Sequence, residues 1–79
     1  MKFSVTVTLK KDVLDPQGKV VEKTLKNMGY SNIGSVRQGK FFEIDLNEKN
    51  IDEVKKKAEE MCKKLLANTV IEDYIINIK

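Results

Sequence analysis

The chain has 79 residues, a formal net charge of +3 and a hydrophobic content of 41%, which fits one small domain over residues 1–79. Its single cysteine and its lack of histidine exclude an intramolecular disulfide, a multi-cysteine metal site and histidine-based acid–base catalysis. No apolar run approaches the roughly 20 residues that span a bilayer, and basic and acidic residues alternate along the chain, so we expect a cytoplasmic protein with neither a membrane nor a nucleic acid as its partner.

A strand is predicted over residues 2–10, because apolar and polar side chains alternate there. One face consists of Phe3, Val5, Val7 and Leu9, and the other of Ser4, Thr6 and Thr8. The polar face indicates that helices cover only one side of the sheet and leave the other side open.

A helix is predicted next, beginning at Pro16. Asp15 can cap the free N–H groups of its first turn, and Pro16 has no N–H to leave unsatisfied. Its apolar stripe consists of Val20, Val21, Leu25 and Met28. Gly29 can adopt the left-handed conformation that ends a helix, and Tyr30 can pack back on the last turn.

A β-hairpin is predicted after this helix. A strand over roughly 35–38 leads into Gln38–Gly39, a glycine-containing two-residue loop of the kind that joins antiparallel strands. The returning strand covers residues 40–46, with core-facing side chains at Phe42, Ile44 and Leu46. The side chains on the open face are then those of Phe41, Glu43 and Asp45.

The rest of the chain predicts a second helix and a closing strand. Asn50 and Glu53 have capping-box spacing, and apolar residues recur at three and four positions from Ile51 to Ala67. Asn68 tolerates the left-handed conformation and is expected to end this helix. The closing strand covers residues 69–79, with one face formed by Tyr74, Ile76 and Ile78 and the other by Ile75 and Asn77.

These elements follow the order strand, helix, strand, strand, helix, strand, or βαββαβ. We therefore predict an α+β fold of the ferredoxin-like type, a two-layer sandwich in which two helices cover one face of a four-stranded antiparallel sheet. No linker or low-complexity segment divides the chain.

Four stretches of the sequence together resemble the PurS family, the small subunit of phosphoribosylformylglycinamidine synthase. These stretches are Leu9-Lys10, Val13 to Gly18, Val36 to Lys40, and Met61-Cys62 with Leu65 to Tyr74. Their order and spacing extend the resemblance over essentially the whole chain. Thr69 is a minor departure, because proline is frequent at this position in the family.

The resemblance implies a role in de novo purine biosynthesis, in the conversion of formylglycinamide ribonucleotide (FGAR) to formylglycinamidine ribonucleotide (FGAM) with ATP and glutamine. It implies that this chain is a non-catalytic subunit that joins the large synthase subunit to the glutaminase subunit and supports ammonia transfer between them. It also implies self-association as a homodimer or higher oligomer. No cofactor is expected in this subunit, whereas ATP and Mg²⁺ are expected in the large synthase subunit.

Seven residues at loops, turns and the open face are candidates for contacts with a partner protein. They are Asp15, Gln17, Gly18, Arg37, Lys40, Phe41 and Asn68. A loop that enters a helix presents free backbone donors, a lone arginine can make planar two-pronged contacts, and an exposed aromatic can fill a pocket in a partner.

Each candidate also has a purely structural interpretation. Asp15 can be an ordinary helix cap, and its carboxylate argues against a phosphate site at that helix end. Arg37 can be a solvated charge at a strand end, and Gly39 beside it suits a turn. Phe41 can be one of the single exposed apolar residues that most proteins carry.

An RNA-binding module of the RRM type is the main alternative, because it has the same βαββαβ order and the run from Arg37 to Phe42 is basic, glycine-containing and aromatic. Against it, Phe41 is the one aromatic expected on the open face, and Glu43 and Asp45 would repel phosphate. A free-standing enzyme is less favoured still, because Cys62 falls on an apolar helix stripe and has no activating partner.

Overall fold

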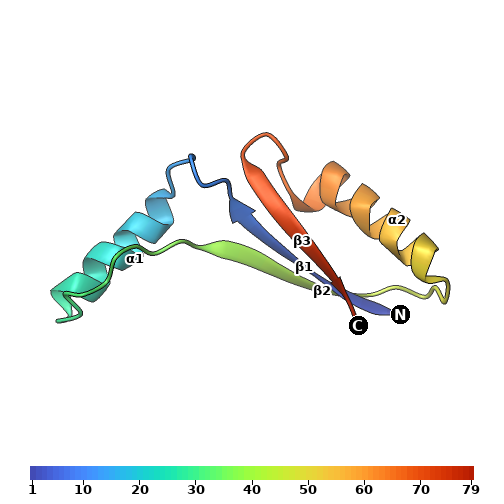
Figure 1. The fold of residues 1–79 in the computed structure, drawn as a ribbon, viewed down its shortest axis with the longest axis horizontal. Coiled ribbons are helices and arrows are strands. Elements are labelled where there is room, and N and C mark those ends of the chain that lie inside the picture. Colours follow the sequence, from blue (N-terminus) through green and yellow to red (C-terminus); the bar gives the residue numbers. More distant parts are fainter.

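The computed structural model describes residues 1–79 as a three-stranded sheet with two helices. Strand β1 (Lys2–Leu9) lies in the centre and pairs antiparallel with β2 (Gly39–Asp45) on one side and β3 (Glu72–Ile78) on the other. Figure 1 shows α2 (Ile51–Met61) lying along this sheet, whereas α1 (Pro16–Asn27) projects beyond the end of the sheet.

The core lies between β1 and α2. The alternation in β1 sends its apolar side chains to one face, as predicted, and there they meet one stripe of α2. The fully buried side chains are Phe3, Val5, Val7, Val54, Ala58 and Cys62. Only 10 of the 79 residues are buried, so this interior is thin even for a small protein, and the burial of a few side chains supplies most of its stability.

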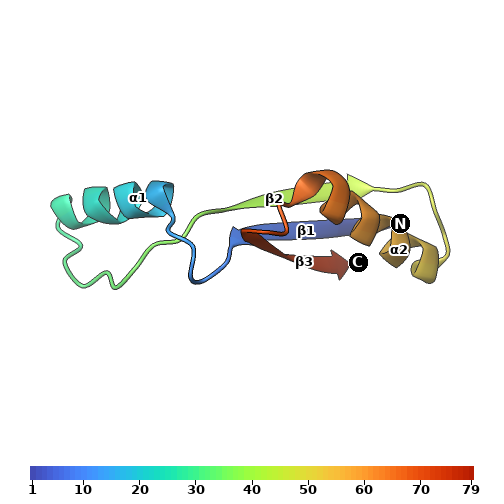
Figure 2. The same ribbon diagram turned by 90° about the horizontal axis from the view of Figure 1, so that it is seen from above.

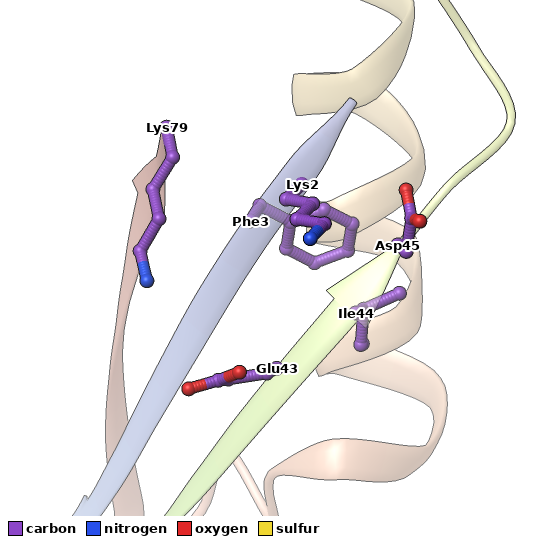
Figure 3. Close-up of a pocket in the computed structure, with 6 residues that line it drawn as sticks. All are labelled: Lys2, Phe3, Glu43, Ile44, Asp45 and Lys79. Carbon is purple, nitrogen blue, oxygen red and sulfur yellow. The ribbon is translucent and has the colours of Figure 1, made fainter.

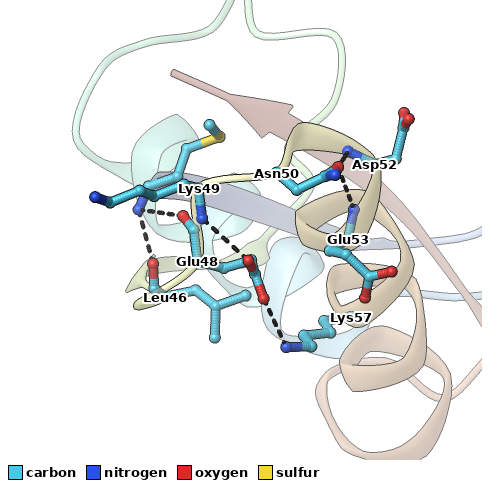
Figure 4. Close-up of polar contacts among 8 residues, drawn as sticks. Leu46, Glu48, Lys49, Asn50, Asp52, Glu53 and Lys57 are labelled. Atoms are coloured by element: carbon cyan, nitrogen blue, oxygen red, sulfur yellow. Dashed lines mark hydrogen bonds and ion pairs between the residues drawn. The ribbon is translucent and has the colours of Figure 1, made fainter.

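The start of α2 is fixed by the predicted cap, and Figure 4 shows the contacts around it. The side-chain oxygen of Asn50 accepts hydrogen bonds from the N–H groups of Asp52 at 2.9 Å and Glu53 at 3.3 Å. Lys57, one turn further on, pairs with Glu48 at 3.1 Å, and this contact lowers the pKa of the Glu48 carboxyl. The loop before the helix is therefore tied to its second turn.

The end of α2 differs from the prediction. The helix continues into a π-helical turn, η1 (Cys62–Leu66), in which the N–H of Ala67 donates to the carbonyl of Cys62 at 2.9 Å. Asn68 was expected in the left-handed conformation, and that expectation is wrong, because Gly29 is the one residue with a positive φ, at 105°. The wider turn ends the helix, so no left-handed residue is needed there.

The predicted four-stranded sheet is wrong. Residues 35–38 form no strand and Gln38–Gly39 forms no hairpin. After α1 the chain turns back, runs past α1 without forming another strand and enters β2, as Figure 1 shows. The reason is the hydrogen bonding of this segment: the N–H of Gln38 donates to Asp15 and the guanidinium of Arg37 donates to carbonyls of the loop after β1. These groups are satisfied within the α1 region and not by a neighbouring strand.

The expectation that both helices cover one face of the sheet is also wrong, because only α2 does so. No residue of α1 belongs to the core cluster, and Figure 2 shows α1 and the sheet lying end to end. The molecule measures 49 × 24 × 15 Å and its radius of gyration is 16.0 Å, against about 12 Å for a compact chain of this length. We call residues 10–38, which carry α1 away from the sheet, the arm.

Candidate functional site

The arm carries a well-formed helix whose apolar stripe is uncovered. Its N-terminus is capped by Asp15, and at its C-terminus the N–H of Tyr30 donates to Leu25 and that of Gly29 to Lys26, both at 3.1 Å, which is the hydrogen-bond pattern of a Schellman motif. The predicted caps are therefore confirmed. Val20 and Met28 on the stripe are each 65% exposed, so the stripe has no partner within this chain.

A second uncovered apolar surface lies beside α2. It is an open groove of about 430 Å³ between the end of α2, η1 and strand β2. We call this surface the groove, and its apolar lining residues are Ile44, Met61, Leu65 and Leu66. Leu65 is 83% exposed. In a closed two-layer sandwich this side of the sheet would be covered by the first helix, which here lies in the arm.

The joint between the arm and the sheet is a network that we call the clasp, formed by Asp15, Arg37 and Gln38. The guanidinium of Arg37 donates to the carbonyls of Lys10 at 2.9 Å and Leu9 at 3.2 Å. It also donates to the carbonyls of Val13 at 3.3 Å and Lys11 at 3.5 Å. One planar cation therefore holds the loop after β1 in a single shape.

Asp15 completes the clasp from the other side. Its side chain is buried, and its two oxygens accept from the N–H of Gln38 and from the N–H of Gly18, each at 2.8 Å. These hydrogen bonds, that from Gln38 foremost, lower the pKa of the Asp15 carboxyl, and the charge of Arg37 acts in the same direction. The carboxylate is therefore held ionised, and it joins the first turn of α1 to the segment that enters β2.

The open face of the sheet carries the third surface. The strand register places Phe41 and Ile75 on either side of Thr6 in one row across the sheet. Phe41 is 60% and Ile75 69% exposed, so two large apolar side chains stand beside a threonine in the middle of an uncovered face. We call Thr6, Phe41 and Ile75 the open-face row.

The seven predicted partner residues do not form one site. Four of them gather at the clasp, where the side chain of Gln17 also accepts from that of Gln38 at 2.9 Å; these four are Asp15, Gln17, Gly18 and Arg37. Lys40 pairs with Glu72 at 3.6 Å, and Phe41 lies on the open face. Asn68 lies in the turn before β3, where its side chain accepts from the N–H of Val70 at 3.2 Å. Their roles toward a partner stay predictions.

The groove was not among the predicted sites. Its residues were assigned to the core stripes of β2 and α2, because the pattern gave no reason to doubt that both helices would cover the sheet. A signal did exist in the breadth of the α2 stripe, since adjacent residues such as Met61 and Cys62, or Leu65 and Leu66, cannot all face one sheet.

The acidic residues and the single cysteine are spread over the chain. No group of three or more histidine, cysteine or carboxylate side chains is placed to hold a metal ion. Burial, together with the nearby Glu59 carboxylate, raises the pKa of the Cys62 thiol, which keeps it protonated and a poor nucleophile. The helices of this structure are too short and too polar to cross a membrane.

Comparisons with known proteins agree over nearly the full length. The family model described as "PurS: Phosphoribosylformylglycinamidine (FGAM) synthase" matches residues 2–79. The Bacillus subtilis protein named phosphoribosylformylglycinamidine synthase subunit PurS is 49% identical over 73 residues, which cover 92% of this chain and 86% of that protein.

Solved structures give the same result. The crystal structure of Methanocaldococcus jannaschii PurS, described as one of the subunits of formylglycinamide ribonucleotide amidotransferase in the purine biosynthetic pathway, superimposes with a TM-score of 0.88 at 44% identity and covers 99% of this chain and 94% of its own. A chain in the structure of PurLQS from Thermotoga maritima superimposes with a TM-score of 0.87 at 26% identity, covering 96% and 93%.

Proposed function

Because the chain belongs to the PurS family of phosphoribosylformylglycinamidine synthase subunits, we propose that it is a non-catalytic subunit that joins the large synthase subunit to the glutaminase. Its role lies in purine biosynthesis, in the conversion of FGAR to FGAM. In this proposal the large subunit binds ATP and Mg²⁺, ammonia released by the glutaminase reaches that subunit without escaping to solvent, and the complex works in the cytoplasm.

The observation that carries the proposal is the match to the family over residues 2–79. A scaffold needs uncovered surfaces and no reactive group, and this chain has three such surfaces: the stripe of α1, the groove and the open-face row. The RRM alternative is not supported, since the matches are to the PurS family throughout and the open face carries Phe41 as its one aromatic.

Reconstitution of the three-subunit enzyme tests this function. The large synthase subunit and the glutaminase are mixed with and without this chain, and FGAM formation is measured with glutamine and, separately, with ammonium as the nitrogen source. We expect omission of the chain to abolish glutamine-dependent turnover and to leave ammonium-dependent turnover. Equal glutamine-dependent rates with and without the chain would contradict the proposal.

We also propose that the chain self-associates by exchanging arms, so that α1 of one copy lies in the groove of a second copy. Both surfaces are apolar and uncovered, and α1 points away from the groove of its own chain (Figure 1). An element that packs on an identical partner in place of its own chain is a common route to a homodimer. Such an exchange would bury the stripe and the groove together.

A matched pair of exposed positions tests the exchange. Leu65→Glu puts a charge into the groove, whereas Val70→Glu puts the same charge at an 80% exposed residue outside it. By sedimentation velocity, Leu65→Glu is expected to weaken dimer formation about tenfold or more, the effect of losing one central interface residue, and Val70→Glu to leave it unchanged. A Leu65→Glu protein as dimeric as the wild type would contradict arm exchange.

A further inference from the structure

The outer strand β3 has a free edge, because β1 is its only neighbour in the sheet. The N–H of Lys79 donates to the carbonyl of Lys2 at 3.1 Å, and the N–H of Lys10 donates to the carbonyl of Ile71 at 2.9 Å. Every second residue of an antiparallel strand directs its backbone groups to the same side, so the odd-numbered residues of β3 bond to β1. The N–H and C=O groups of the even-numbered residues therefore point away from the sheet.

Three of these even-numbered residues have outward backbone groups with no partner in the chain. They are Tyr74, Ile76 and Ile78. At the fourth, Glu72, the N–H donates to the carbonyl of Asn68 at 2.7 Å. A row of free donors and acceptors at this spacing is completed by an extended segment of another chain, so the edge specifies the conformation of what would bind to it.

The edge of β3 lacks the features that keep an exposed strand edge from pairing. The strand has seven residues in unbroken register and contains no lysine, arginine or proline. The other outer strand, β2, carries the exposed charges of Lys40, Glu43 and Asp45. Figure 3 shows both outer strands at one end of the sheet, with Glu43 and Asp45 on β2 and, across β1, the end of β3 leading into Lys79.

A hollow beside this edge gives an incoming segment a side-chain preference. It measures about 260 Å³ and is lined by Ile76 and Ile78 of β3 and by Lys55 and Glu59 of α2. Glu59 already accepts from the hydroxyl of Tyr74 at 2.5 Å, whereas Lys55 is exposed and forms no ion pair. An apolar side chain would cover the two isoleucines, and an acidic one would pair with Lys55.

We propose that the free edge of β3 receives an extended segment of a partner subunit as an added strand. This segment places an apolar side chain over Ile76 and Ile78 and a carboxylate beside Lys55. The proposal rests on the subunit role proposed above and assigns one partner contact of that role to a defined edge. It leaves the stripe of α1, the groove and the open-face row available for other contacts.

A second copy of this chain fits the edge less well. Pairing of β3 with β3 about a two-fold axis would place both α2 helices on the same side of the joined sheet. The two hollows would then face each other, with isoleucines as the floor of both and no large side chain to fill either. The Lys55 ammonium groups of both copies would also meet there, although each Glu59 is already bonded to Tyr74.

Residue-resolved hydrogen exchange tests the pairing, because the two sides of β3 provide an internal comparison. In the dilute isolated chain we expect the amides of Ile75 and Asn77, which bond to β1, to exchange slowly and those of Ile76 and Ile78 to exchange quickly. Exchange is then measured in complexes with the large synthase subunit, with the glutaminase and with both. The amides of Ile76 and Ile78 are expected to slow about tenfold or more in the complexes that contain the subunit supplying the segment.

Two exposed lysines of α2 provide matched variants. Lys55→Glu reverses the charge beside the edge, and Lys56→Glu makes the same change at a neighbouring exposed residue that does not line the hollow. Binding is measured by fluorescence anisotropy as the labelled chain is titrated with the two partner subunits, and circular dichroism melts verify that both variants are folded. Lys55→Glu is expected to raise the apparent Kd roughly three- to tenfold, and Lys56→Glu to leave it unchanged.

Three results would overturn the proposal. One is an alternating exchange pattern along β3 that persists in the three-subunit complex, and another is equal binding of Lys55→Glu and Lys56→Glu. The third is protection of Ile76 and Ile78 that grows with the concentration of the isolated chain, which would assign the edge to a second copy. Glutamine-dependent FGAM formation separates the two proposals: if the chain supports it while the alternating pattern persists, the subunit role stands and edge pairing fails.

Discussion

The carboxylate of Asp15 accepts a hydrogen bond from the N–H of Gln38, 23 positions later in the chain, at 2.8 Å. Its other oxygen accepts from the N–H of Gly18 in the first turn of α1. One buried side chain thus joins the start of the arm helix to the segment that leads into β2.

Asp15→Asn is expected to change how stability depends on pH. The pKa of Asp15 lies below its ordinary value of 3.8 in the folded chain, mainly because of the N–H of Gln38. Its contribution to the free energy of unfolding is therefore present above about pH 4 and is lost as the pH falls through the lowered pKa. The free energy of unfolding of the wild type, measured with urea, is expected to fall over that pH range. Asp15→Asn is expected to be less stable than the wild type near neutral pH and to lose less stability as the pH falls.

Asp12→Asn, a change at an exposed residue of the same loop, is the control for Asp15→Asn. Its free energy of unfolding is expected to change with pH in the same way as that of the wild type. Glu48 also has a lowered pKa and is present in all three proteins, so its effect cancels in the comparison. Equal acid-induced losses in Asp15→Asn and the wild type would contradict the role of Asp15 in the clasp.

Arg37→Ala is expected to loosen the loop after β1. Four carbonyl oxygens lose a donor, of which that of Lys10 is the nearest, at 2.9 Å. Because the guanidinium is exposed, the expected loss is only about 1 kcal/mol of unfolding free energy. Hydrogen exchange is the sharper measurement, since backbone amides of residues 10–15 are expected to exchange faster while those of β1 stay protected.

Arg37→Lys separates shape from charge in the clasp. It keeps the cation, but a single ammonium cannot span four carbonyls as the planar guanidinium does. We therefore expect exchange in the loop close to that of Arg37→Ala. Full protection in Arg37→Lys would mean that charge alone holds the loop.

Gly18→Ala is expected to destabilise the arm, because a β-carbon at this position would clash with the carbonyl oxygen of Val36. That contact is with backbone and cannot be relieved by rotating a side chain, so the expected cost is about 1–3 kcal/mol. Gly34→Ala is the matched control, since a β-carbon there meets nothing within 4 Å. Thermal melts are expected to show a lower Tm for Gly18→Ala and an equal or higher Tm for Gly34→Ala.

The phenol of Tyr74 is expected to lose its proton at a higher pH than an ordinary tyrosine. Its hydroxyl donates to Glu59 at 2.5 Å, and this hydrogen bond, with burial and the charge of Glu59, raises its pKa to about 12 from an ordinary value of 10. In a Tyr30→Phe background, where Tyr74 is the sole tyrosine, phenolate absorbance is expected to rise near pH 12. The stability that this hydroxyl contributes is present below pH 10 and is lost as the pH rises to about 12.

Glu59→Gln tests the cause of the Tyr74 shift. Removing the carboxylate removes the charge that opposes phenolate formation, so the midpoint of the absorbance titration is expected to move down toward the ordinary value. An unchanged midpoint would assign the shift to burial of the ring. The titration is reversible and needs no partner protein.

The elements of this chain could be predicted from sequence where the signal is local. The alternation in β1, the Asp15 and Asn50 caps and the left-handed Gly29 are properties of a few neighbouring residues, and the structure confirms them. The π-helical turn η1 has no such signature, because Cys62 and its neighbours continue the helical pattern into it.

The direction of the arm could not be predicted in the same way. Gln38–Gly39 has the composition of a hairpin turn. In a hairpin the backbone N–H groups of this segment would donate to a neighbouring strand, whereas here they donate to other acceptors. The deciding partner is Asp15, which is far from Gln38 in sequence and which the sequence already explained as a helix cap. The groove was missed for the same reason, since it exists only because the arm is open.

The thin interior described above has a consequence for the amount of folded protein that a cell maintains. Because so few side chains are buried, any molecule that binds the folded chain adds a large fraction to its stability, by mass action and in proportion to that molecule's supply. Copies made in excess of their companions are the first to open and to be degraded. We therefore expect the amount of this subunit to follow that of the whole assembly without any dedicated control of its synthesis.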